Sequence, residues 1–223
     1  MSAATAATAE GSAGTRRRPS PRFIGIALTA VVVAAMALDT TYKKPGETTV
    51  SGRAVFDPAA YAEKTFPKAV ATLEQGAVPL ARLHAALRKD PDAAGERYGK
   101  RQGSSPYSFS ASGEGLAGKA ESGLMPVRVK DVPESATVSL QVGPAINGTA
   151  IRDGVGFIEF GQFTNQVEYA AAATALNTKV KEQVLEGIEP ATLEGKRVSF
   201  VGAFSLVTPD VVTITPVRLE EAS

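Results

Sequence analysis

The sequence predicts an α+β chain that has an N-terminal membrane helix, a short helical segment, and then an OB-like five-stranded β-barrel with an inserted long helix. Three observations lead to this prediction. An uncharged apolar run occupies residues 23–38, helix-start signals recur within residues 57–101, and strand-like alternation of apolar and polar residues dominates residues 106–220. Three strands, a long helix and two more strands is the element order of an OB-type barrel. A mixed sheet with packed helices shares this order and stays open as an alternative.

The N-terminal residues 1–22 are small, polar and basic, and their composition predicts disorder. Four arginines precede the apolar run, which predicts that this side stays in the cytoplasm and that the following residues are exported. The run of 16 residues lies between the lengths of a spanning helix and of a signal-peptide core. Residues 23–38 are therefore expected to be a transmembrane anchor or a signal segment that is cleaved after Ala37.

Composition excludes several classes of function. Without residues 1–37 the chain has 20 basic and 22 acidic side chains, so it lacks the basic surplus that nucleic-acid binding requires. The absence of cysteine removes disulfides, thiol catalysis and a lipidated cysteine. The single histidine, His84, lies in a helical pattern and is predicted to be a surface residue. Since no activated nucleophile or metal cluster can be nominated, we expect neither an enzyme nor a bound cofactor or metal.

The segment that follows the apolar run begins without helical periodicity, so residues 39–56 are predicted to form a stalk. Asp57-Pro58 and Asp90-Pro91 each combine an N-cap carboxylate with proline at the first helical position. These signals predict two to four short helices within residues 57–101. Proline should interrupt them at Pro67, and a new helix should start near Pro79.

Five strands are predicted from alternating patterns at residues 107–111, 127–130, 138–142, 198–206 and 211–219. Gly113 and Gly115 should let the first strand bend far enough to serve both sides of a barrel. These glycines also begin a G-x-G-x-x-G pattern. No helix-forming sequence follows it, so a bent strand is favoured over a nucleotide site.

A long helix is predicted over residues 166–187, with Asn165 as its N-cap and Glu168 reaching back from three positions on. Residues 155–163 are harder to interpret, because their three phenylalanines suit either a helical turn or a strand.

Polar residues that can hydrogen-bond in fixed directions lie among aromatic residues just before and at the start of this helix. Such a mixture commonly holds a small polar ligand or a partner peptide. The residues predicted to bind a ligand are Arg152, Asp153, Asn165, Gln166 and Tyr169. In the alternative interpretation Arg152 and Asp153 pair with neighbours to order a loop while Asn165 only caps the helix, and the sequence leaves both open.

Several short segments carry a family resemblance that covers nearly all of residues 40–220. They are residues 56–58 with Tyr61, then 143–144, 148–153, 165–170, 176–177, 202–204 and 215–217. Through them the chain resembles the bacterial domain-of-unknown-function family 2291, described as predicted periplasmic lipoproteins. The resemblance implies an extracytoplasmic protein, often encoded beside sugar-type ABC uptake systems, without an established activity. The chain departs from the lipoprotein description because it has no cysteine, which leaves residues 23–38 as the tether.

The leading functional hypothesis is a single-pass protein of the cytoplasmic membrane whose soluble domain is periplasmic. It would act as an accessory binding protein of an ABC-type sugar uptake system. Its expected partners are the membrane, through residues 23–38, and a transporter component or solute-binding protein, but no nucleic acid. The alternative is a structural envelope protein without a small-molecule ligand.

Overall fold

The computed structural model describes residues 55–222. The predicted basic N-terminus, the apolar segment and most of the stalk lie outside the described residues. A compact unit begins at Phe56, whose ring packs against those of Tyr61 and Phe163 at centroid distances of 5.5 and 5.4 Å. The folded unit therefore starts at the last residue of the predicted stalk. Within residues 55–222, no helix is both long enough and apolar enough to cross a bilayer.

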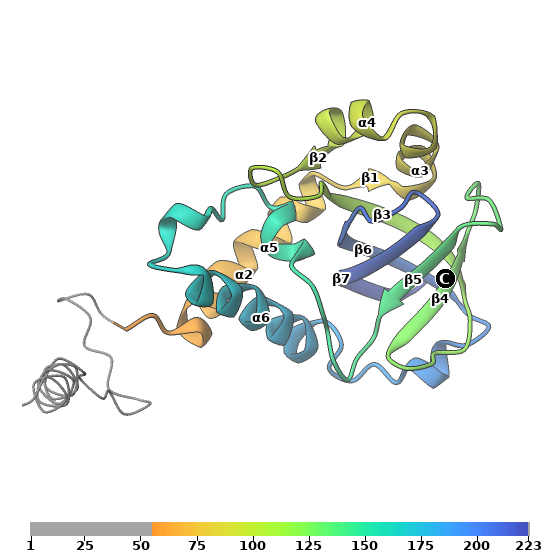
Figure 1. The fold of residues 1–223 in the computed structure, drawn as a ribbon. Coiled ribbons are helices and arrows are strands. Elements are labelled where there is room, and N and C mark those ends of the chain that lie inside the picture. Colours follow the sequence, from red (N-terminus) through yellow and green to blue (C-terminus); the bar gives the residue numbers. More distant parts are fainter. Residues whose placement is uncertain (1–54, 223) are drawn as a thin grey trace, which may run out of the picture. The chain divides into compact units, whose positions relative to one another are not determined.

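Five strands form the barrel that the sequence predicts (Figure 1). They are β3 (Ser108–Ala117), β4 (Leu124–Val129), β5 (Thr137–Gln141), β6 (Arg197–Ser205) and β7 (Val211–Glu221). Neighbouring strands follow the order β3-β4-β5-β7-β6, and β6 pairs again with β3, which closes the barrel. The β5–β7 pair is parallel and the other four pairs are antiparallel. This closure excludes the alternative of an open mixed sheet.

Strand β3 pairs with two other barrel strands, as its glycines predict. It pairs with β6 from Ser108 to Leu116 and with β4 from Gly115 to Ala117. A Cβ atom on Gly115 would lie only 2.3 Å from the carbonyl oxygen of Arg128. A side chain at position 115 would therefore push the two strands apart, and the glycine-rich pattern is a feature of strand packing.

Three helices precede the barrel: α2 (Pro58–Gln75), α3 (Leu80–Lys89) and α4 (Pro91–Tyr98). Two short strands, β1 (Val78–Pro79) before α3 and β2 (Gly99–Lys100) after α4, pair with β3. The aspartate side chains accept hydrogen bonds at both predicted helix starts: Asp57 from the backbone N–H groups of residues 59 and 60, and Asp90 from that of residue 93.

The predicted interruption at Pro67 is wrong, because α2 continues through it to Gln75. Pro67 lies on the exposed side of α2, whereas Phe66 and Leu73 on the other side are only 2% and 1% exposed. Burial of this apolar face stabilises the helix beyond the proline, since tertiary packing often overrides local propensity.

The long connection between β5 and β6 contains the remaining helices. They are α5 (Ala150–Gly154), η1 (Phe160–Gln162), α6 (Gln166–Gln183) and η2 (Pro190–Leu193). Residues 155–163 thus form neither a strand nor an α-helix. Their one regular element is the 3-10 turn η1. Asn165 caps α6 as predicted, because its side chain accepts a hydrogen bond from the N–H of Glu168 at 3.0 Å. The Glu168 carboxylate in turn accepts one from the N–H of Thr164 at 2.9 Å.

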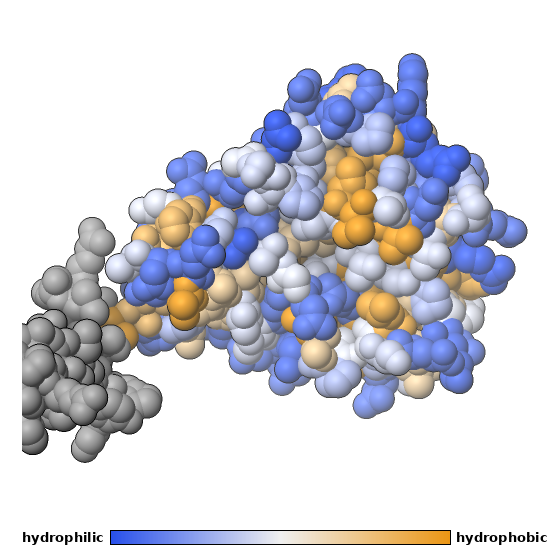
Figure 2. All heavy atoms as spheres, in the orientation of Figure 1, coloured by the Kyte–Doolittle hydropathy of each residue, from blue (hydrophilic) through white to orange (hydrophobic). Residues whose placement is uncertain are grey.

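Two hydrophobic clusters hold the domain together. The first fills the barrel and includes three leucines of α3, together with Phe109 and Phe204 from β3 and β6. The second lies between α2, α5 and α6 and includes Ala203 of β6 and Val217 of β7. On the visible face, hydrophilic residues predominate, while apolar residues gather beside α3 and α4 and at the end where α2 begins (Figure 2).

The prediction that His84 is a surface residue is wrong, because the side chain is only 2% exposed. Four residues after Leu80 and three before Leu87, it belongs to the same buried face of α3. Its Nε2 atom has no hydrogen-bond partner. A buried imidazole without this partner is expected to stay neutral.

We expect this burial to make stability depend on pH. Burial lowers the pKa of His84 from about 6.5, and the charge of Asp210 only partly opposes this shift. The unfolded chain therefore binds a proton near pH 6.5 that the folded chain binds only at lower pH. The contribution of His84 to the free energy of unfolding is complete above pH ~6.5. Below that pH it decreases, by at most ~1.4 kcal/mol per pH unit. Urea unfolding between pH 7 and 5 measures this slope. His84→Leu should flatten it, and an unchanged slope in that variant would assign the effect to other groups.

Candidate functional site

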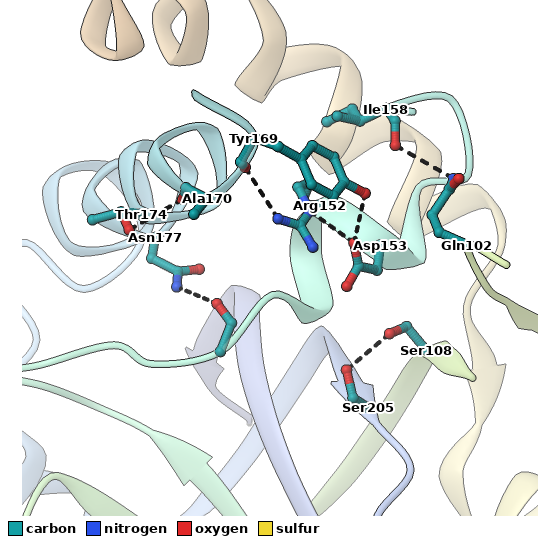
Figure 3. A network of polar contacts seen from close by, with 11 residues as sticks. Gln102, Ser108, Arg152, Asp153, Ile158, Tyr169, Ala170, Thr174, Asn177 and Ser205 are labelled. Carbon is teal, nitrogen blue, oxygen red and sulfur yellow. Dashed lines mark hydrogen bonds and ion pairs between the residues drawn. The ribbon is translucent and has the colours of Figure 1, made fainter. Parts of the chain in front are cut away.

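Helix α5 carries two of the predicted ligand-binding residues, Arg152 and Asp153, each only 8% exposed. The Arg152 Nε atom donates to Oδ1 of Asp153 at 2.7 Å, and its Nη1 atom donates to the backbone carbonyl of Tyr169 at 3.0 Å. The guanidinium also lies over the Tyr169 ring, 3.5 Å from its centroid. Figure 3 shows these side chains pointing toward one another between α5 and α6. The arrangement fixes the short helix α5 to the start of α6.

The Tyr169 hydroxyl completes this network by donating to Oδ1 of Asp153 at 3.3 Å. Burial raises the pKa of Tyr169, and the nearby Arg152 charge only partly offsets this. Burial likewise raises the pKa of Tyr61, which also lies within the field of Arg152. Both phenols therefore remain protonated at neutral pH and can act as hydrogen-bond donors.

The structure brings together three of the five predicted residues and leaves Asn165 and Gln166 outside the network. Asn165 uses its side-chain oxygen to cap α6, an interaction that typically contributes ~1 kcal/mol to stability. Gln166 is the exposed first residue of that helix. These positions support the loop-ordering interpretation that the sequence left open. Ligand binding by these five residues remains a prediction.

The segment that leads into α5 contains some of the residues that carry the family resemblance. It is also held in place by hydrogen bonds within the protein. The Gln141 side chain donates to the carbonyl of Asn147 at 3.0 Å and accepts from its N–H at 2.8 Å. Asn177 of α6 donates to the carbonyl of Gly148 at 2.9 Å. Because both amides are buried, they fix the path of the chain into α5, which places Arg152 and Asp153.

A different part of the surface is hollowed enough to hold a ligand. A groove of about 700 Å³ lies along β4, between the second half of β3 and the β4–β5 loop, and we call it the β4 groove. It is lined by Glu114, Gly115, Leu116, Val127, Arg128, Val129, Lys130, Val132, Pro133, Glu134, Ala136, Val138 and Arg197. Its volume lies within the range of small-molecule sites, roughly 300–1,000 Å³.

The β4 groove combines apolar side chains with a charged rim. Val127 and Val138 are buried, whereas Arg128, Lys130 and Glu134 are exposed. At one side Arg197 donates to the Glu114 carboxylate at 3.2 Å. Such a site can pack against an apolar ligand face while its rim hydrogen-bonds hydroxyl or carboxylate groups.

Sequence reasoning missed this groove, because β3, β4, the β4–β5 loop and β6 all contribute to it. The available signal was the alternation on β4, where Val127 and Val129 are followed by the basic residues Arg128 and Lys130. In OB folds the face of the second and third barrel strands binds oligonucleotides and oligosaccharides. Here the second strand, β4, lines the groove, whereas the third strand, β5, contributes only the buried Val138. Among residues 55–222, no group of three or more histidine, aspartate or glutamate side chains could hold a metal ion.

Comparison with known proteins agrees with this architecture. The crystal structure of an OB-fold protein from Thermotoga maritima superposes with a TM-score of 0.60 at 21% sequence identity, covering 76% of this chain and 100% of that one. This likeness confirms the OB-type fold. No curated protein matches the chain. Residues 27–220 match the sequence profile of the DUF2291 family, which is described as predicted periplasmic lipoprotein. The chain therefore belongs to the DUF2291 family.

Proposed function

We propose that this protein is an extracytoplasmic binding module of an ABC-type sugar uptake system, held at the outer face of the cytoplasmic membrane by residues 23–38. The observation that carries the proposal is the β4 groove, which has the size and the mixed lining of a small-molecule site and includes the second barrel strand, β4, one of the two strands whose face OB folds use for binding. The periplasmic description of the family supports the location. The chain has no cysteine that could carry a lipid, so the apolar segment is the proposed tether.

The chemistry of the groove suits a polar, uncharged ligand such as a sugar. Arg128, Lys130 and Arg197 supply donors, and Glu114 and Glu134 supply acceptors. Sugar hydroxyls can use both kinds of group, and the less polar face of a sugar ring can pack on the valines beneath them. The proposed role is binding rather than catalysis.

A structural envelope protein without a small-molecule ligand is the second candidate. One observation favours it: the polar side chains of Arg152, Asp153 and Tyr169 bond to one another. In this candidate the β4 groove would contact a protein partner or nothing at all.

A thermal-shift screen with sugars distinguishes the two candidates. A sugar present at ~100 times its dissociation constant should add about 2.7 kcal/mol to the free energy of unfolding. Arg128→Ala should abolish the shift because it removes a donor from the groove rim. Lys119→Ala should keep it, because Lys119 is an exposed basic residue outside the groove that pairs with Glu121.

A flat screen with every sugar would favour the structural candidate. The association with uptake has its own test, in which membrane pull-downs should recover a transport component and gene deletion should reduce uptake of one sugar. If both experiments gave negative results, we would reject the association with transport.

A further inference from the structure

The β4 groove extends across several strands instead of closing around one point. Its lining residues come from β6, β3, β4, the β4–β5 loop and β5. Within it, Leu116 of β3 is paired with Arg197 of β6 on one side and with Arg128 of β4 on the other. Residues directly opposite each other in a sheet share a face, so these three side chains form one row across the groove.

This row gives the groove its length. Neighbouring strands lie ~4.8 Å apart, so two spacings separate Arg197 from Arg128 by about 10 Å. Beyond Arg128 the lining continues with Pro133 and Glu134 of the β4–β5 loop, which projects beyond the barrel (Figure 1). One sugar unit of a glycan chain advances about as far as one strand spacing. A single sugar would therefore cover one position of the row and leave the others in water.

The chemistry changes along the row, from a charged end through an apolar middle to a second charged end. At the β6 end Arg197 donates to Glu114, and this exposed pair keeps further donors and acceptors for a ligand. Leu116, which is 39% exposed, provides an apolar surface in the middle. At the loop end Arg128 and Glu134 are exposed and again supply a donor and an acceptor. Successive positions can thus contact successive rings.

The lining also limits the kind of chain that fits. None of the described residues that line the groove is aromatic, so the groove lacks the platform on which the bases of a single-stranded nucleic acid stack. Three basic and two acidic side chains line it, which gives little attraction for a phosphate backbone. Without an aromatic platform each sugar ring makes only weak contacts, so firm binding requires several rings.

We propose that the β4 groove binds an uncharged oligosaccharide of about three units, laid across β6, β3 and β4 toward the β4–β5 loop, rather than a single sugar. The cost of lost translational and rotational freedom arises once for the whole chain, whereas each ring adds its own contacts. This inference rests on the proposed sugar-binding role, and the experiment below separates the two.

A series of glycan lengths tests the inference. An array of uncharged oligosaccharides first identifies the linkage that the full chain, solubilised in detergent, binds most strongly. Isothermal titration then measures the dissociation constant for one to six units of that linkage. We expect each added unit to tighten binding by about fivefold, the factor that one net hydrogen bond gives, and the gain to level off after about the third unit.

Variants at the two ends of the row test where the chain lies. In Arg197→Ala, and separately in Glu134→Ala, the affinity should stop rising one unit earlier than in the parent chain. Both side chains are exposed, so the melting temperature should change little. Lys119→Ala is the control, because Lys119 is exposed outside the groove and should leave the whole length series unchanged.

A single sugar that binds as tightly as the longest chain would overturn the oligosaccharide inference and leave the sugar-binding role intact. An affinity that rises with length but keeps the parent's profile in both end variants would also overturn the inference, since the chain would then lie elsewhere. If no glycan of any length binds, both proposals fail.

Discussion

Arg152→Ala is expected to lower the free energy of unfolding by ~3–5 kcal/mol, because it leaves the buried Asp153 carboxylate without its ion-pair partner. The substitution also removes the guanidinium that lies over the Tyr169 ring and its hydrogen bond to the Tyr169 carbonyl. The contact between α5 and α6 should loosen as a result. Urea unfolding of both proteins at pH 7 measures the loss, which is a large part of the ~5–15 kcal/mol that stabilises a typical domain.

Arg197→Ala is the matched control, because Arg197 also forms an ion pair, at 3.2 Å with Glu114, but its side chain is 66% exposed. Removing an exposed pair typically costs only ~0–1 kcal/mol. A different result for Arg152→Ala would change the role that we assign to Arg152. If Arg152→Ala unfolded like the parent chain but failed to bind its ligand, the ligand role predicted from the sequence would replace the loop-ordering role.

Phe109→Ala is expected to cost ~3–5 kcal/mol, the usual range for truncating a fully buried phenylalanine. The Phe109 side chain is completely buried, and its ring stacks on Phe204 of β6 at a centroid distance of 5.4 Å. It belongs to the cluster in which the leucines of α3 meet the barrel. The alanine variant would leave a cavity between the barrel and α3, and chemical unfolding should show a lower midpoint.

Leu116→Ala on the same strand tests whether the loss comes from the cavity. Leu116 is 39% exposed and lines the β4 groove. Substitutions at such surface positions usually change stability by only ~0.5 kcal/mol. Equal losses in the two variants would show that disturbance of β3 itself, rather than the cavity, causes the effect.

The parts of the fold that could be predicted from the sequence depend on local chemistry. Asp57 and Asp90 mark helix starts because a carboxylate and the following proline satisfy the first turn without help from the rest of the chain. Strand β4 was predictable because its buried and exposed residues alternate along the strand. The other barrel strands were predictable from their alternating residue types, although several of their polar residues are buried. The element order then indicated the barrel.

The features that were missed depend on contacts between distant segments. Pro67 does not break α2 because the buried face of that helix packs on the rest of the domain. His84 is buried because the β6–β7 turn lies near α3, where Arg88 pairs with Asp210 at 2.6 Å. His84 does share the helical spacing of Leu80 and Leu87, but the turn that covers this face of α3 is more than 100 positions away in the sequence.

The candidate sites also combine features that local sequence encodes with features that depend on contacts between distant segments. Arg152, Asp153 and Tyr169 were identified as a group from their residue types, but only the fold shows that their polar atoms face one another. Helix α5 is too short, with five residues, to give a periodic pattern. The β4 groove has no sequence motif, since β3, β4, a loop and β6 build it together.

The pairing of β3 with β6 also determines when this domain can fold. Ser108 and Ser205, whose hydroxyls lie 2.8 Å apart, are separated by 97 positions, and synthesis at ~5–20 residues per second takes ~5–20 s to cover that distance. Until then the first barrel strand lacks its pairing with β6, and contacts this distant form slowly. If the chain is exported while it is being made, its barrel cannot close before export begins, because β6 and β7 are the last elements to be synthesised. Secretion and folding would then be consecutive steps rather than competing ones.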